Sequence, residues 1–448
     1  MRPVSSLLIA AALVFSPIAS ADVKLPTVID SHMVLQRDTP LTIWGWADAG
    51  EEVTVKLGGS SAKATTGEDG QWSMELPAMK ASRKPHSMTV TGNNEIKLED
   101  ILIGEVWVGS GQSNMEWQLQ STAGATEAIK DADFKYIRLF HVPKVQAPSP
   151  ANDVVADWKV CTPANIPAFS AVLYYYGKKL HEELDVPIGL INSSWGGSAI
   201  EPWTIANGQS GGMYNGMIAP LLSFSVRGVI WYQGETNVLQ KNGLAYYDRM
   251  KALIEGWRSS WGQEHMPFYY VQIAPWKGSY GPGELPALWE AQAKTLTLPH
   301  TGMAVITDLV DNIADIHPQN KLDVGERLAR WALAKTYGEE KVVYSGPLYK
   351  SMEIKGSKIQ INFAHAKGLK VRVKKPLSEF QIAGADGNYV PAKAKIVSGK
   401  VIVSAAGVKE PKNVRFGWHA LANPNLVNAA GLPAAPFQTE SWSGGTGE

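Results

Sequence analysis

A serine lies in a glycine-rich turn at the end of an apolar stretch of the chain. Residues 109–115 read Gly-Ser-Gly-Gln-Ser-Asn-Met and follow the alternating apolar run 101–108, which predicts a buried strand. At such a strand end the Ser113 hydroxyl can project above the sheet, with nearby backbone N–H groups facing a substrate. This position suits a nucleophile, although glycine–serine turns also serve purely structural purposes.

Two further segments with hydrogen-bond donors also follow apolar strand patterns. Residues 192–198 read Asn-Ser-Ser-Trp-Gly-Gly-Ser after a predicted strand, and residues 231–237 read Trp-Tyr-Gln-Gly-Glu-Thr-Asn at the end of another. The backbone N–H of Gly196 or Gly197 and the side-chain amide of Asn237 can each donate to an oxyanion. A tight glycine loop and helix capping by Asn237 are the structural alternatives.

His317 provides a base that is active near neutral pH, which a serine hydroxyl needs in order to lose its proton. It lies in Asp315-Ile316-His317-Pro318, after a predicted strand at 303–307 and before a helix predicted from about residue 320 to 337. An imidazole must also be held in one tautomer, usually by a carboxylate, and Asp315 is near enough in sequence to do this. The chain thus offers a nucleophile, oxyanion donors and a base, each following a predicted strand.

The predicted elements bring these segments to one edge of a sheet. Between residues 101 and 338 strand patterns alternate with helical periodicity, which predicts an α/β domain with a mostly parallel sheet and helices on both faces. Parallel strands end at a common edge, where such folds carry their sites. Short strands and turns predict β-sandwich-like regions over 22–100 and 339–442.

The two ends of the chain are expected to lie outside these domains. Residues 1–21 combine Arg2, a short apolar core and Ala19-Ser20-Ala21, which is typical of a cleaved signal peptide. The apolar core is too short to span a bilayer. We therefore expect an exported protein, periplasmic or extracellular, with no membrane insertion. The glycine-rich residues 443–448 predict a flexible tail.

Composition argues against several other functions. The 448 residues carry 42 basic and 42 acidic side chains, so no charge excess favours nucleic acid or an anionic membrane. Cys161 is the only cysteine, which excludes an intrachain disulfide, and its surroundings favour a buried structural thiol over a nucleophile. Neither a metal-ligand cluster nor a phosphate-binding loop is found, so no metal and no cofactor are expected. The sequence does not indicate an oligomeric state.

Taken together, the motifs resemble those of the SGNH-hydrolase superfamily, and within it the sialate O-acetylesterase type of carbohydrate esterase. The superfamily is named for Ser, Gly, Asn and His in four sequence blocks, which here give Ser113, Gly197 in preference to Gly196, Asn237 and His317. Met33-Val34-Leu35-Gln36-Arg37 and the segment 425–433 resemble the family too, so the likeness covers nearly all of the chain after residue 21. It implies a three-layer, flavodoxin-like catalytic domain at residues 101–338.

The resemblance also implies a mechanism, in which Ser113 forms an acetyl-enzyme with His317 as the base. The backbone N–H groups of Ser113 and Gly197, with the Asn237 amide, would form the oxyanion hole. Three further side chains near the motifs are candidates for substrate contacts: Gln112, Trp195 and Glu235.

The acid that orients His317 departs from the superfamily pattern. The superfamily places an aspartate three residues before the histidine, and here that residue is Ala314. Asp315 is our assignment. Asp311, Asp308 or a backbone carbonyl are the alternatives.

The implied substrate is an O-acetylated carbohydrate, either a sialic acid or a hemicellulose such as xyloglucan or xylan. One rival interpretation is a non-catalytic carbohydrate-binding protein, whose sequence signature would be loss of Ser113 or His317. Another is a lipase or thioesterase with the same triad, which predicts an apolar acyl pocket or lid. No amphipathic lid rich in Leu or Phe is apparent near the motifs.

Overall fold

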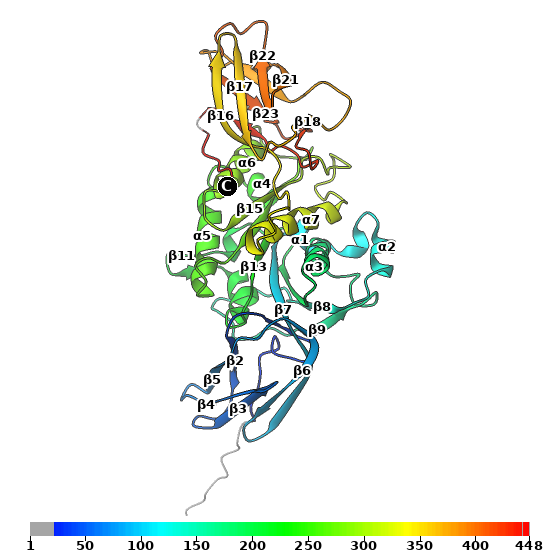
Figure 1. The fold of residues 1–448 in the computed structure, drawn as a ribbon. Helices are drawn as coiled ribbons and strands as arrows, with labels where there is room; N and C mark the ends of the chain where they lie inside the picture. The colour runs from blue at the N-terminus through cyan, green and yellow to red at the C-terminus, as the bar shows by residue number, and fades with distance from the viewer. Residues whose placement is uncertain (1–21, 441, 448) are drawn as a thin grey trace, which may run out of the picture.

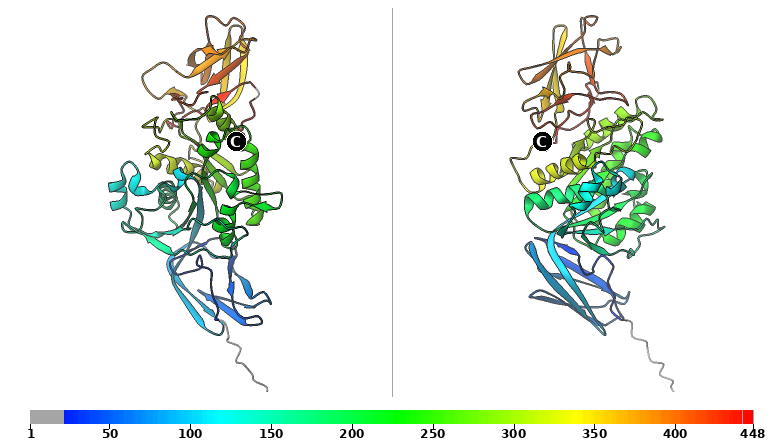
Figure 2. Two further views of the ribbon diagram at one scale, coloured as in Figure 1. Left: turned by 180° about the vertical axis from the view of Figure 1, so that it is seen from behind. Right: turned by 90° about the vertical axis from the view of Figure 1, so that its right-hand side faces the viewer.

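The structure, a computed structural model, describes residues 22–440 and 442–447. The predicted signal peptide at 1–21 and Glu448 at the end of the predicted tail lie outside the described residues. The chain forms an elongated molecule in which an α/β region separates two β regions, one at each end (Figures 1 and 2).

A sheet with the strand order β15-β14-β13-β7-β10-β8-β9 forms the middle region. Every pairing from β15 to β8 is parallel, and only the edge strand β9 is antiparallel. The strands are β7 (Glu95–Gly111), β8 (Phe134–His141), β9 (Trp158–Cys161), β10 (Ile188–Ser194), β13 (Gly228–Tyr232), β14 (Phe268–Gln272) and β15 (Thr301–Val305). Because their carboxyl ends meet at one edge, the loops after β7, β10 and β13 lie together.

Helices cover both faces of this sheet. Successive residues of a strand point to opposite faces. On β14, the Tyr269 ring packs 6.4 Å from that of Trp331, whereas the Tyr270 hydroxyl donates to the Gln292 carbonyl at 2.6 Å. Trp331 and Gln292 belong to α7 (Lys321–Trp331) and α6 (Glu284–Thr295), which therefore lie on opposite faces. The helices α3 (Ala171–Leu184) and α5 (Tyr246–Ser260) pack beside α7 and α6 respectively.

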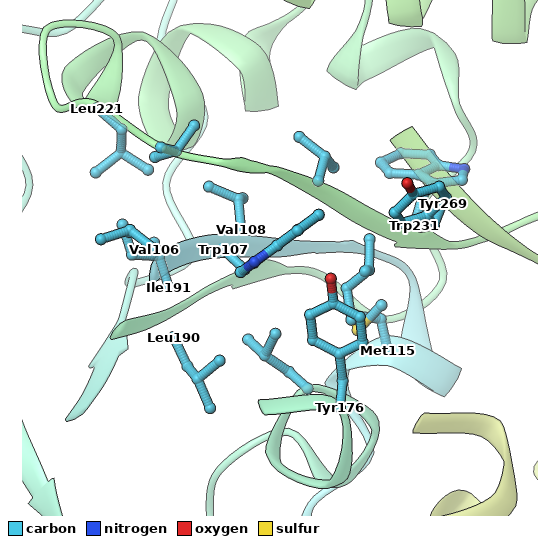
Figure 3. Close-up of a cluster of buried hydrophobic side chains, with 14 of the residues drawn as sticks. Val106, Trp107, Val108, Met115, Tyr176, Leu190, Ile191, Leu221, Trp231 and Tyr269 are labelled. Carbon is cyan, nitrogen blue, oxygen red and sulfur yellow. The ribbon is translucent and has the colours of Figure 1, made fainter. Parts of the chain in front are cut away.

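Large aromatic and aliphatic side chains fill the space between the sheet and the helices (Figure 3). Trp107 of β7 packs edge-on against Tyr176 of α3 with ring centroids 5.2 Å apart, and Trp231 of β13 lies between Trp203 and Trp257. All five rings are at most 1% exposed. Each such side chain contributes about 2–3 kcal/mol on burial, which fixes the sheet rigidly under the loops at its edge.

The N-terminal β region shares its longest strand with the middle region. The first part of β7 pairs with β6 (Ser82–Thr91), and β3 (Glu52–Leu57) and β4 (Ser60–Thr65) extend that sheet. β1 (Val34–Gln36) runs parallel to the middle of β7, while β2 (Leu41–Trp46) and β5 (Gln71–Leu76) form a separate two-stranded sheet. The domain boundary predicted after residue 100 therefore falls inside a continuous strand.

The C-terminal region is built from two four-stranded sheets around a hydrophobic core of its own, which includes Ile361, Ile382, Val403 and Phe416. The first sheet contains β16 (Leu348–Lys355), β17 (Lys358–Ala364), β22 (Lys400–Ser404) and β21 (Lys393–Val397). The second contains β20 (Val390–Pro391), β19 (Phe380–Ala383), β23 (Asn413–Phe416) and β25 (Phe437–Gln438).

The described part of the predicted flexible tail lies against the middle region, where the Gly445 N–H donates to the Ala293 carbonyl of α6 at 2.9 Å. Among residues 22–440 and 442–447, no helix combines the length and apolar character needed to cross a membrane.

The junction between the N-terminal and middle regions depends on a buried carboxylate. Glu105 of β7 is fully buried and accepts hydrogen bonds from Arg37 at 2.5 Å, Arg227 at 2.7 Å and Gln36 at 3.1 Å. We expect Glu105→Gln to lower the free energy of unfolding by about 2 kcal/mol, because it removes the buried anion that Arg37 and Arg227 share. Urea denaturation followed by tryptophan fluorescence measures this loss.

Glu99→Gln is the matched control, since Glu99 is an exposed residue of the same strand. Equal stability of the two variants would contradict the role given to Glu105.

Candidate active site

The nucleophile candidate stands where β7 gives way to a short helix. β7 ends at Gly111, and α1 (Ser113–Glu116) begins two residues later with Ser113 half-buried. Gly111 has φ of +135°, and a Cβ there would lie 2.2 Å from the Tyr232 carbonyl oxygen of β13. Only glycine fits this close approach of two strands, which turns the chain out of the sheet before Ser113.

The structure brings Ser113 and His317 together across 204 positions of sequence. Nε2 of His317 lies 2.9 Å from Oγ of Ser113, and the imidazole stacks on the Trp117 ring at a centroid distance of 4.5 Å. Burial and the nearby charge of Lys321 lower the pKa of His317, while Asp315 opposes this effect. The neutral imidazole, which can accept a proton from the serine, is therefore favoured.

Three carboxylates were candidates to orient His317, and the structure separates them. Oδ1 of Asp315 accepts the backbone N–H of His317 at 2.8 Å and lies 3.6 Å from Nδ1 of the ring. Asp308 forms a two-pronged ion pair with Arg327, and Asp311 accepts the backbone N–H of Gln319 at 3.3 Å. Asp315 is thus beside the imidazole, at a distance longer than a hydrogen bond.

The paired glycines after β10 differ in their hydrogen bonding. The Gly196 N–H donates to the Glu116 carboxylate at 2.5 Å, and a Cβ at Gly196 would lie 3.5 Å from Cβ of Ser113. Gly197 has φ of +76° and is exposed. Among the described residues, no acceptor is found for its N–H or for that of Ser113. Gly197 and Ser113 therefore have the backbone donors that remain available to a ligand.

Asn237 lies in α4 (Glu235–Leu239) with its amide already engaged. Its Nδ2 is 3.2 and 3.3 Å from the two carboxylate oxygens of Glu201, and its Oδ1 accepts from Gln233 at 2.7 Å and the Ile200 N–H at 3.1 Å. The side chain has no exposed surface. Its predicted role as an oxyanion donor stays a prediction, and these contacts do not supply it with a free N–H.

The three candidates for substrate contact have different surroundings. Gln112 is 3% exposed, and its Oε1 accepts from the side chain of Gln233 and from the backbone N–H groups of Gly234 and Thr236. Glu235 is 2% exposed and accepts from Asn114 at 2.6 Å. Gln112 and Glu235 are therefore buried side chains that hold neighbouring segments by hydrogen bonds, whereas Trp195 is half-exposed beside the glycine pair.

Sequence reasoning missed two polar residues behind the nucleophile, Asn114 and Lys321. Asn114 is fully buried, and Lys321 is 1% exposed at the first position of α7, where its ammonium donates to the side-chain Oδ1 of Asn114. A lysine in the first turn of a helix, close after the histidine segment, was the available signal, since the helix dipole disfavours a cation there.

Two other expectations concern Cys161 and the presence of a metal site. Cys161 is buried, and burial raises the pKa of its thiol to about 12, so it remains protonated at neutral pH. Within residues 22–440 and 442–447 no group of three or more His, Cys, Asp or Glu side chains is arranged to hold a metal ion.

Comparison with known proteins gives this geometry a context. The family described as "carbohydrate esterase, sialic acid-specific acetylesterase" matches residues 103–334. A solved carbohydrate acetylesterase from Xanthomonas citri is 40% identical, with a TM-score of 0.90, covering 94% of this chain and all of that one. The sialate O-acetylesterase of Homo sapiens is 29% identical, and the match covers 92% of each of the two chains. That of Rattus norvegicus is 28% identical, with 93% of each chain covered.

At the carboxyl edge of this α/β sheet a serine is hydrogen-bonded to a histidine. Together with these relatives, the arrangement defines a carboxylic ester hydrolase. Within that class, the chain belongs to the sialic acid-specific acetylesterase family of carbohydrate esterases.

The close approach at Gly111 can be tested by substitution. We expect Gly111→Ala to lower the free energy of unfolding by about 3 kcal/mol or more and to abolish esterase activity, because the Cβ must displace the backbone beside Ser113. Gly124→Ala shares a positive φ, +72°, but its Cβ meets no atom within 4 Å. That control should cost about 1 kcal/mol and keep activity. Similar losses in both would show that backbone conformation alone matters.

Proposed function

We propose that the protein removes O-acetyl groups from carbohydrates by acyl transfer to Ser113. The 2.9 Å hydrogen bond between Ser113 Oγ and His317 Nε2 carries the proposal. Membership of a carbohydrate esterase family supports it. The scaffold we infer is the three-layer, mostly parallel SGNH domain implied by the sequence motifs, flanked by two sandwich-like regions.

In the first step His317 takes the Ser113 proton, and the serine oxygen attacks the acetyl carbonyl carbon. The N–H groups of Ser113 and Gly197 donate to the resulting oxyanion. Asn237 can join them only if its amide leaves Glu201. His317 then protonates the departing sugar oxygen as its bond to the acyl carbon breaks, and a water activated by His317 hydrolyses the acetyl-enzyme.

Asp315 is the group we assign to orient the imidazole. A contraction of the 3.6 Å separation from Nδ1 gives a hydrogen bond, and catalytic hydrogen bonds often shorten when substrate binds. Its charge favours the imidazolium that forms during the reaction.

The substrate class we propose is an acetylated sugar outside the cell, either a sialic acid or a hemicellulose such as xyloglucan or xylan. The similar proteins include sialate O-acetylesterases and a carbohydrate acetylesterase, which supports this class. The export expected from residues 1–21 belongs to the same proposal.

Acetate release tests the assignment of Ser113. Wild-type protein and Ser113→Ala are assayed on O-acetylated sialic acid, acetylated xyloglucan, acetylated xylan and p-nitrophenyl esters of increasing acyl length. We expect Ser113→Ala to lose at least about 10³-fold in kcat, because the covalent route is removed. Acetyl esters should be cleaved faster than longer ones.

Ser121→Ala is the control for this experiment, since Ser121 is an exposed serine shortly after α1, the helix that begins with Ser113. Release by Ser113→Ala equal to that of wild type would overturn the assignment, and a preference for long acyl chains would favour the lipase alternative.

The pH dependence tests the role of His317. Because burial and Lys321 lower its pKa, the neutral base persists below its ordinary value of 6.5. We expect kcat/KM for p-nitrophenyl acetate to fall on acidification with a midpoint below 6.5, since protonation of the free enzyme removes the base. A midpoint clearly above that value would contradict the environment described for His317.

A further inference from the structure

A lysine is buried directly behind the proposed catalytic pair. Lys321 is 1% exposed and begins α7, where the helix dipole also disfavours a cation. Its ammonium lies 5.9 Å from the ring centre of Trp117 and 5.4 Å from that of Tyr232. No carboxylate of the described residues pairs with it directly. A buried cation of this kind requires compensation from elsewhere.

Asn114 provides that compensation by bridging the lysine to a buried acid. Its Oδ1 accepts from the Lys321 ammonium, and its Nδ2 donates to Oε1 of Glu235 at 2.6 Å. This orientation of the amide is dictated by charge, because the reverse would place N–H groups against the ammonium and an oxygen against the carboxylate. The three side chains therefore form one ammonium–amide–carboxylate relay.

The relay also joins the two halves of the catalytic pair. Asn114 directly follows Ser113, and its Nδ2 donates at 3.1 Å to the carbonyl of Ile316, the residue before His317. Both segments are thus held by one buried amide. A change in its position would alter the distance between the serine oxygen and the imidazole.

The charges around the pair can be assigned to particular elements. His317 is influenced by Lys321 of α7 and by Asp315 of its own segment, with Ser113 and Trp117 in contact. Lys321 is influenced by Glu235 of α4 and by Asp315 and Asp311 of the histidine segment, and burial lowers its pKa to about 7. Burial raises the pKa of Glu235, against the opposing effects of Asn114 and Lys321.

We propose that Lys321, Asn114 and Glu235 are positioning residues that hold His317 against Ser113 and keep the imidazole neutral before attack. The proposal rests on the acyl-transfer function above. The positive charge of Lys321 disfavours the imidazolium, so the base is available at lower pH. The same charge makes the imidazolium, once formed, a stronger acid toward the departing sugar oxygen.

Removal of the charge gives the decisive experiment. We expect Lys321→Met to move the acidic limb of kcat/KM for p-nitrophenyl acetate to higher pH by about 0.5–1 unit, because the imidazolium is no longer disfavoured. The kcat should fall by about tenfold or more from loss of positioning, with KM changed less than about twofold. Lys321→Arg keeps the charge and should retain the wild-type limb.

A second variant keeps the test sound if Lys321→Met does not fold. In Lys321→Met/Glu235→Gln both buried charges are removed, which avoids an unpaired acid. It should show the same shift of the acidic limb, because Glu235 is not among the groups that influence His317. Lys335→Met is the charge-matched control, since Lys335 is exposed on the helical turn after α7.

The two proposals fail in different ways. Suppose that folded Lys321→Met and the double variant both keep the acidic limb and the kcat of wild type, while Ser113→Ala is inactive. This result would overturn the relay and leave the acyl-transfer function standing. Full activity of Ser113→Ala would overturn the acyl-transfer function on which the relay depends.

Discussion

Strand β7 is the constraint on which the rest of the structure depends. Its 17 residues pair with the N-terminal sheet at one end and with β10 and β13 at the other, so hydrogen bonds hold it on both sides. Glu105, buried between Arg37 and Arg227, fixes the point where the strand passes from one region to the next. The strand ends at Gly111, and this rigid base sets the position of Ser113.

Polar side chains hold the loops at the sheet edge by hydrogen bonds. Gln112 binds the segment after β13, Glu116 binds the Gly196 N–H, and Asn114 binds the histidine segment. Each contact crosses between segments that are distant in sequence, which orders loops whose backbone would otherwise need water. Burying Gln112 and Asn114 costs free energy unless their hydrogen-bond partners are supplied, so the arrangement favours a single geometry.

Elements and site residues could be predicted from the sequence where they depend on a local pattern of apolar residues. The strand predicted at 303–307 and the helix predicted from about 320 to 337 could be found from their apolar patterns, and they correspond to β15 (Thr301–Val305) and to α7 with the helical turn that follows it. The proximity of Ser113 and His317 followed from their shared place after parallel strands. The continuity of β7 across residue 100 could not be predicted, because the strand changes from alternating to continuous burial where its pairing partners change, and such a change is typical of a domain boundary. Lys321 was missed for a related reason, since burial of a charge depends on partners supplied by other segments.

The C-terminal region supports the other half of the catalytic pair. The Trp276 N–H donates to the Ala420 carbonyl of that region at 3.0 Å, and its indole N–H donates to the Ala314 carbonyl at 3.1 Å. Lys277 adds a backbone bond to Ile313 at 2.7 Å. The segment that carries His317 is therefore tied to the C-terminal β region, as Ser113 is tied to the N-terminal one through β7. Each β region thus stabilises the position of one member of the catalytic pair. Because the reactive atoms of that pair must stay within hydrogen-bonding distance, both β regions have a structural role at the site.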